Sequence, residues 1–163
     1  MEMFADWHDY FIAQVGAAAA LSGLLFVAMS INIERILKYP WLPSRAAVAM
    51  LLLVGTLIES SFALWPHQPA RIVGVELLAA SGIVWIAALR LTFGGPRATS
   101  EYASETRRSD VLLQLTAITA VAGAAIVVGF GSPAGVYVIA TSMLMAISIG
   151  FLNSWVLLVE ILR

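Results

Sequence analysis

The sequence predicts an all-α protein, an integral membrane bundle of five transmembrane helices with its N-terminus outside and its C-terminus in the cytoplasm. Of the 163 residues, 61% are hydrophobic and only 12% are charged, and the mean hydropathy is +0.92. Soluble domains carry about 25% charged residues, and a small globule has too little interior to bury this much apolar surface. We therefore expect residues 1–163 to form a single transmembrane domain, with the lipid bilayer as its main solvent.

Five apolar stretches are each long enough to cross a bilayer, which takes roughly 17–25 residues. A charged, proline-bearing joint separates the first two, Trp65-Pro66 ends the second, and Pro69 fits the first turn of the third. Gly131-Ser132-Pro133 predicts a tight turn before the fifth, with Ser132 as the N-cap. The predicted helices cover about 11–34, 45–65, 70–92, 111–130 and 134–160, and a cytoplasmic loop covers 94–110.

The placement of lysine and arginine predicts the orientation and tests the helix count. Basic residues in short loops stay cytoplasmic. With five spans, eight of the nine basic residues fall on one side of the membrane, and only Arg71 falls on the other. A count with one helix fewer would scatter them. The eight are Arg35, Lys38, Arg45, Arg90, Arg97, Arg107, Arg108 and Arg163.

Composition and motifs argue against several classes of function. The net charge of −1 argues against a nucleic-acid partner. The chain has no cysteine, which rules out disulfides, thiol catalysis and thiolate metal sites. It has no phosphate-binding glycine loop, zinc-protease motif or G-x-S-x-G motif, so we expect no enzyme. We also expect no cofactor and no metal site, because His8 and His67 show no characteristic ligand spacing.

Two glutamates lie inside predicted spans. Glu59 precedes the end of its helix by six residues and Glu76 follows Arg71 by five, which places both roughly 8–9 Å below the outer boundary. An ionised carboxylate facing lipid costs roughly 2.5 kcal/mol or more, so both should face the bundle interior, a wet cavity or each other. One hypothesis is a proton or cation site, with at least one carboxyl group protonated and hydroxyl partners at Thr56 and Ser60. The alternative is an internal pair with Arg71, or access of outer water to both carboxylates.

Small side chains recur every third or fourth position along the first predicted helix. Small residues let helices approach closely in lipid, where van der Waals packing drives association. We call this line of small residues the seam. It predicts either ordinary packing within the bundle or association of the first helix with its copies around a symmetry axis. In the second case Glu34, the next member of the repeat, would come together with Glu34 of the other copies. These carboxylates would form a ring at the cytoplasmic mouth of a pore. The seam consists of Ala13, Gly16, Ala20, Gly23, Val27 and Ser30.

Three segments carry a resemblance to a known family. The stretch 22–32 (SGLLFVAMSIN), with Trp7-His8-Asp9-Tyr10 before it and 155–162 (WVLLVEIL) near the end, resembles a family of small uncharacterised bacterial multipass membrane proteins. The resemblance covers most of the chain. Members are sometimes labelled modulators of a membrane-anchored AAA protease. The resemblance therefore implies a multipass protein of the bacterial inner (plasma) membrane with a membrane protein partner, and it carries over no catalytic residues.

A shorter similarity concerns the first helix alone. The residues SG and VAM within 22–29 resemble the pore helix of the calcium release-activated channel family. That family places its filter glutamate two residues after the methionine, where this chain has Ile31. The family's pore helix also runs from the cytoplasm outward, opposite to the orientation predicted here. These two departures indicate coincidence among small and apolar residues.

The sequence favours a small homo-oligomeric channel or ion-binding membrane protein, with Glu59, Glu76 and Glu34 as candidate sites on the ion pathway. The competing hypothesis is a non-catalytic regulator or assembly partner of another membrane protein, such as a membrane-anchored protease, bound through the small-residue faces.

Overall fold

The computed structural model describes residues 4, 6–38, 42–94 and 103–162, which form helices joined by short turns and loops. The helices in chain order are α2 (His8–Ile31), α3 (Ile33–Lys38), α4 (Leu42–Ala63), α5 (Ala70–Gly94), α6 (Ala103–Phe130) and α7 (Ala134–Leu162). Five of these are long and apolar enough to cross a membrane, and α3 is the short exception. The sequence also predicts five long apolar helices, and the structure confirms this number among its described residues.

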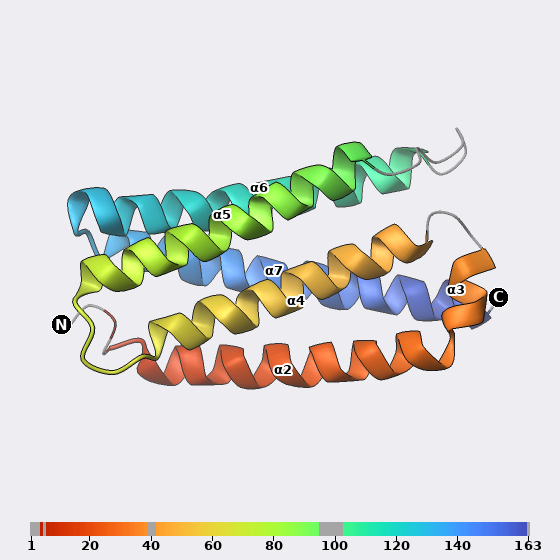
Figure 1. The fold of residues 1–163 in the computed structure, drawn as a ribbon, viewed down its shortest axis with the longest axis horizontal. Coiled ribbons are helices and arrows are strands. Elements are labelled where there is room, and N and C mark those ends of the chain that lie inside the picture. Colours follow the sequence, from red (N-terminus) through yellow and green to blue (C-terminus); the bar gives the residue numbers. More distant parts are fainter. Residues whose placement is uncertain (1–3, 5, 39–41, 95–102, 163) are drawn as a thin grey trace.

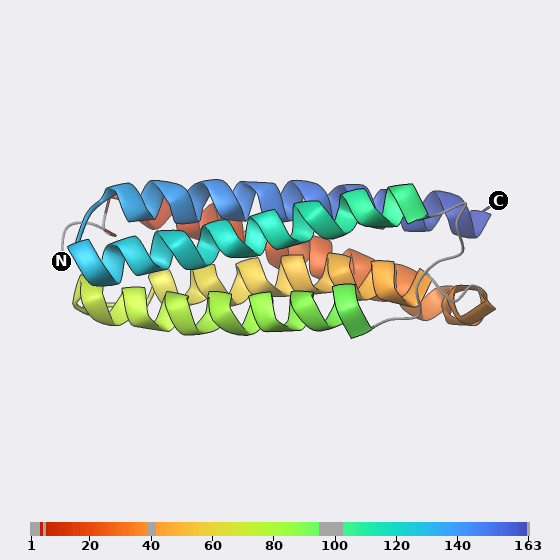
Figure 2. The same cartoon turned by 90° about the horizontal axis from the view of Figure 1, so that it is seen from above.

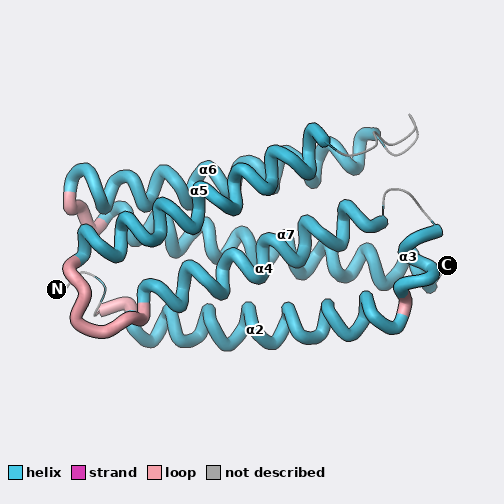
Figure 3. The backbone as a smooth tube through the Cα atoms, viewed as in Figure 1, coloured by secondary structure: helices cyan, strands magenta, loops and turns pink. Residues whose placement is uncertain are grey.

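The five long helices lie side by side and alternate in direction, so the two ends of the chain lie at opposite ends of the bundle (Figures 1 and 2). We call these the N-terminal end, where α2 begins, and the C-terminal end. Helix α4 packs against α2, α5 and α7, and α6 packs against α5 and α7. Short loops join α4 to α5 and α6 to α7 at the N-terminal end (Figure 3). Any group that α4 turns inward is therefore surrounded by several helices.

The predicted first helix, 11–34, consists of two helices. Helix α2 begins at His8 and ends at Ile31. The side-chain amide of Asn32 donates a hydrogen bond to the carbonyl of Ala28 at 2.9 Å, and asparagine competes with helical backbone bonding in this way. The chain then turns into α3, which carries Glu34. Glu34 therefore does not continue the line of the seam along α2.

The largest of the other differences from the predicted boundaries is at the start of α6, where polar residues continue the helix. Helix α6 begins at Ala103, so the second half of the predicted loop 94–110 is helical. Hydropathy marks where the apolar part of a helix ends, whereas good helix formers such as glutamate and arginine extend the helix beyond it. The predicted helix 45–65 lies at Leu42–Ala63, and the predicted helices 70–92 and 134–160 each extend two residues further.

The turn between α6 and α7 has the predicted capping. The hydroxyl oxygen of Ser132 accepts a hydrogen bond from the backbone N–H of Ala134 at 3.3 Å, which confirms Ser132 as the N-cap. Gly131 ends α6 with φ of 59°, a left-handed conformation that glycine adopts without steric cost.

Helices α6 and α7 make direct backbone contact at two glycines. A Cβ atom added at Gly123 would lie 2.9 Å from the backbone nitrogen of Ile139, and one at Gly135 would lie 2.7 Å from the carbonyl oxygen of Gly123. Neither position leaves room for a methyl group. The close approach of these two helices therefore depends on the absence of side chains here.

Gly135→Ala should destabilise the bundle by roughly 1–3 kcal/mol, because the methyl group would push α7 away from the α6 backbone. The matched control is Gly129→Ala on α6, where an added Cβ meets nothing within 4 Å. This control should be neutral or slightly stabilising, because alanine has the higher helix propensity. Unfolding of the purified variants in detergent measures both effects. Equal losses of stability in the two variants would contradict the contact.

Candidate functional site

The side chain of Glu59 lies inside the bundle. It extends from α4, the helix that packs against α2, α5 and α7, and it is only 6% exposed. The hydroxyl of Ser81 on α5 donates a hydrogen bond to Oε1 of Glu59 at 2.9 Å. Glu59 therefore faces the bundle interior, with a donor from the neighbouring helix on one of its oxygens.

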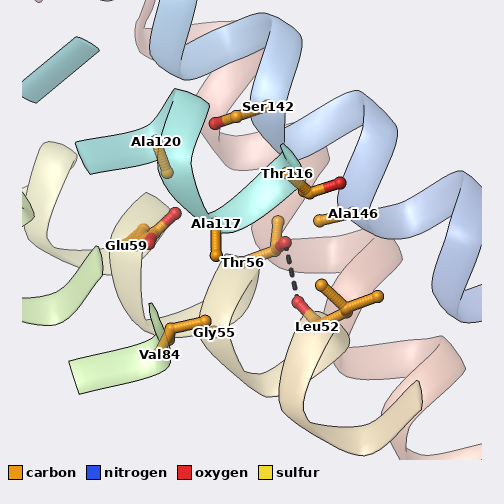
Figure 4. Close-up of a pocket in the computed structure, with 10 residues that line it drawn as sticks. All are labelled: Leu52, Gly55, Thr56, Glu59, Val84, Thr116, Ala117, Ala120, Ser142 and Ala146. Atoms are coloured by element: carbon orange, nitrogen blue, oxygen red, sulfur yellow. Dashed lines mark hydrogen bonds between the residues drawn. The ribbon is translucent and has the colours of Figure 1, made fainter. Parts of the chain in front are cut away.

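A cavity of about 20 Å³ adjoins the Glu59 carboxyl group (Figure 4). A space of this size holds one water-sized particle. Its polar lining comes from three helices: Glu59 and Thr56 on α4, Thr116 on α6 and Ser142 on α7. The other residues that line it are apolar, and none of the described lining residues is basic. The cavity is thus a small, mainly apolar space with four polar residues in its lining.

The three hydroxyl groups around the cavity all bond back to their own helices. Each donates its proton to a backbone carbonyl three or four residues earlier in the chain, at 2.7–2.9 Å. These bonds hold the side chains in fixed orientations. The pairs are Thr56 with Leu52 at 2.9 Å, Thr116 with Leu112 at 2.8 Å and Ser142 with Ile139 at 2.7 Å.

A buried carboxyl group of this kind needs neutralisation. Transfer of an unpaired charge from water to an apolar interior is costly, and a single hydroxyl donor such as Ser81 compensates only part of that cost. Either a proton on Glu59 or a cation in the adjoining cavity would neutralise it. Both are exchangeable species, so the group is chemically able to bind and release one of them.

Glu76 does not lie at the level of Glu59, although the sequence predicts equal depth. Glu59 bonds to Ser81, which lies five residues beyond Glu76 along α5, or about 7.5 Å at 1.5 Å per residue. The offset arises because α5 extends further than α4 at the N-terminal end (Figure 1). Glu76 instead accepts a hydrogen bond from the side-chain amide of Gln68 at 3.1 Å. Its Oε2 atom is buried and has no hydrogen-bond partner among the described residues.

Glu34 and the seam lie on the outside of the bundle. Glu34 is exposed on α3, and all six seam residues of α2 are exposed as well. A Cβ atom added at Gly16 or Gly23 would meet nothing within 4 Å. The face of α2 that packs inward consists of Phe11, Gln14, Ala18 and Leu25. The seam therefore takes no part in packing among the described helices of this chain, and Glu34 is not brought near Glu59.

A larger cavity lies elsewhere, between α2 and α7. It measures about 140 Å³, and its lining is almost entirely apolar, with Leu21 and Ala28 on one side and Phe151 and Trp155 on the other. No carboxyl group lines it among the described residues. The smaller cavity beside Glu59 differs from it in having a carboxyl group and three hydroxyl residues in its lining.

The sequence could not reveal three residues of the site, Ser81, Thr116 and Ser142. Hydroxyl side chains within apolar helices commonly bond to their own backbone, so a serine or threonine in a span does not indicate which neighbour it faces. Thr56 could be associated with Glu59 because both lie on one face of α4. The other three residues could be assigned to the site only once the packing of α5, α6 and α7 around Glu59 was known.

The fold and the site together define a class: a protein whose described residues form helices, five of them able to span a membrane, with a buried carboxyl group beside a small cavity. Comparison of the chain with protein-family models, with curated proteins and with solved structures finds no match. What the site can do follows from its own geometry.

A double-mutant cycle with Ser81→Ala and Glu59→Met tests the hydrogen bond that orients Glu59. Because the bond exists only when both groups are present, the two changes should be non-additive by roughly 0.5–3 kcal/mol in the free energy of unfolding. Ser61→Ala serves as the control, since the Ser61 hydroxyl bonds to Leu57 of its own helix at 2.7 Å. Additive effects of Ser81→Ala and Glu59→Met would contradict the bond.

Proposed function

We propose that this chain is an ion-binding membrane protein, a small channel or carrier for protons or cations in the bacterial inner membrane. The observation that carries the proposal is the Glu59 carboxyl group, enclosed within the bundle beside a cavity with hydroxyl groups from three helices. An ionisable side chain is expensive within a membrane, and such groups mark ion and proton pathways. Glu59 is the group at which the moving ion binds.

The charges at the two ends of the bundle support the orientation in this proposal. Arg35, Lys38 and Arg90 lie on the parts of α3 and α5 at the C-terminal end, whereas Arg71 lies near the start of α5 at the other end. Positive residues remain on the cytoplasmic side, so the C-terminal end is cytoplasmic. Glu76 then lies between the outer surface and Glu59, at the start of the pathway, and the exposed Glu34 lies on the cytoplasmic side.

Glu59→Gln should abolish ion movement, because glutamine keeps the shape of glutamate but can neither release a proton nor supply a negative charge. Purified protein in liposomes, with a dye for internal pH and a tracer for sodium or potassium, measures the flux. We expect at least a tenfold loss for Glu59→Gln, and no change for Glu34→Gln, whose side chain is exposed on α3. Flux that Glu59→Gln leaves unchanged, or no flux in the unaltered protein, would contradict the proposal.

A specific observation also favours a second candidate function, that of a regulator or assembly partner. The seam of small residues on α2 faces away from the bundle, and small residues on a lipid-facing helix allow another helix to approach closely. That second helix belongs either to another copy of the chain, as the homo-oligomeric form of the proposal requires, or to a different membrane protein such as a protease.

Gly16→Ile and Gly23→Ile distinguish a contact surface from a face that only meets lipid. Because an added Cβ meets nothing within 4 Å at either position, the isoleucines should leave the fold of the single chain intact and change its Tm little. The detergent-corrected mass should fall from that of an oligomer to that of a monomer. A mass that is the same before and after the substitutions would count against association through the seam.

A further inference from the structure

We propose that the apolar cavity between α2 and α7 holds part of an acyl chain of an anionic phospholipid from the cytoplasmic leaflet, and that the headgroup of this lipid binds beside the basic residues of α3. The site is separate from Glu59 and does not depend on ion movement. It takes from the proposed function only the orientation of the bundle, with the C-terminal end in the cytoplasm.

The cavity lies between two helices that are joined nearer the N-terminal end. There the hydroxyl of Tyr10 on α2 donates a hydrogen bond to the backbone carbonyl of Ala140 on α7 at 2.7 Å. Leu21 and Phe151, which line the cavity, each lie eleven residues further along their helices, or about 16.5 Å at 1.5 Å per residue. Because α2 and α7 run in the same direction, the cavity is a gap between the same two neighbours in the half of the bundle toward the C-terminal end.

The described lining of this cavity favours hydrocarbon over water. Its surface is almost entirely apolar, and its one hydroxyl group, that of Ser154, donates to the backbone carbonyl of Gly150 of its own helix at 2.7 Å. An apolar cavity of about 150 Å³ stays dry and binds a molecule of the size of benzene. An empty cavity would forfeit the dispersion contacts of the side chains around it. At about 140 Å³, this cavity has room for a hydrocarbon segment of roughly six carbons.

The cavity is accessible from the side of the bundle. Three of the residues that line it have more than half of their surface exposed: Leu24 is 69% exposed, Phe151 51% and Trp155 60%. Toward the interior the lining includes Leu25, which is 3% exposed and packs in a cluster with Leu53 of α4. A lipid chain can therefore enter from the bilayer without displacing a helix.

The charge at the nearby end of the bundle selects the headgroup. Ala28 lines the cavity and lies only three residues before the end of α2, where the chain turns into α3 at the C-terminal end (Figure 1). The exposed side chains of α3 include Arg35 and Lys38 and one acid, Glu34, so this short helix has a net positive charge. Basic residues at the cytoplasmic surface attract anionic lipids. An anionic headgroup therefore complements α3, whereas a zwitterionic headgroup gains less from it.

The test measures the Tm of the purified protein in a nonionic detergent with added phosphatidylglycerol or phosphatidylcholine. The two lipids carry the same acyl chains and differ in the charge of the headgroup. A ligand that binds only the folded protein raises its Tm. We expect phosphatidylglycerol to raise the Tm by about 2–4 °C more than phosphatidylcholine does. Lys38→Gln should weaken the apparent Kd for phosphatidylglycerol by about fivefold, whereas Arg71→Gln, an exposed residue of α5 at the other end of the bundle, should leave it unchanged.

Ala28→Phe should abolish the response to phosphatidylglycerol, because the ring would occupy the cavity. Ala28→Leu adds less volume and should reduce the response, and it provides the same test if the phenylalanine variant does not fold. The matched control is Ala19→Phe, because Ala19 is exposed on α2 nine residues away, which is two and a half turns and therefore the opposite side of the helix. This control should keep the full response.

Equal Tm rises with the two lipids would overturn the inference, as would a response to phosphatidylglycerol that Ala28→Phe and Ala28→Leu both retain. If neither lipid raises the Tm and Ala28→Phe lowers the detergent-corrected mass, the cavity is a contact between copies of the chain and the lipid site is wrong. None of these variants alters Glu59. The liposome flux of the unaltered protein and of Glu59→Gln therefore decides the proposed function separately.

Discussion

The architecture depends on direct contact between helix backbones at small residues. In lipid, apolar side chains give helices no hydrophobic reason to associate, so close packing and hydrogen bonds must hold them together. Gly123 and Gly135 bring α6 against α7, and a Cβ at Gly55 would lie only 3.0 Å from a methyl group of Val84 on α5. These contacts set the spacing and the register of the helices around α4. The position of every inward-facing side chain follows from that register.

The same packing creates the environment of Glu59. Because Gly55 lies opposite Val84, Glu59 one turn further along α4 meets Ser81 one turn earlier along α5. Gly55 also lines the cavity beside Glu59. The close contact between α4 and α5 thus places the buried Glu59 carboxyl group beside Ser81 and the small cavity.

Sequence reasoning succeeded where the signal is local. The apolar stretches predicted the five long helices, Ser132 was identifiable as an N-cap from its place before Pro133, and Glu59 stood out as a charge within an apolar helix. It failed where the answer depends on packing between helices. The partner Ser81 could not be predicted, because equal spacing from the helix ends aligned Glu59 with Glu76. The outward direction of the seam on α2 could not be predicted either, since small residues permit close packing on either face of a helix.

The register between α4 and α5 is the central claim, because it places Glu59 beside Ser81 and the cavity. The chain has no cysteine, so introduced pairs report on single contacts. A Cβ at position 55 would lie 3.9 Å from the Cβ of Val84, within the range of roughly 3.5–4.5 Å for disulfides. Mild oxidation of the protein in membranes should therefore cross-link the pair Gly55→Cys and Val84→Cys. Failure of that pair, with cross-linking of Gly55→Cys to Ser81→Cys instead, would contradict the account.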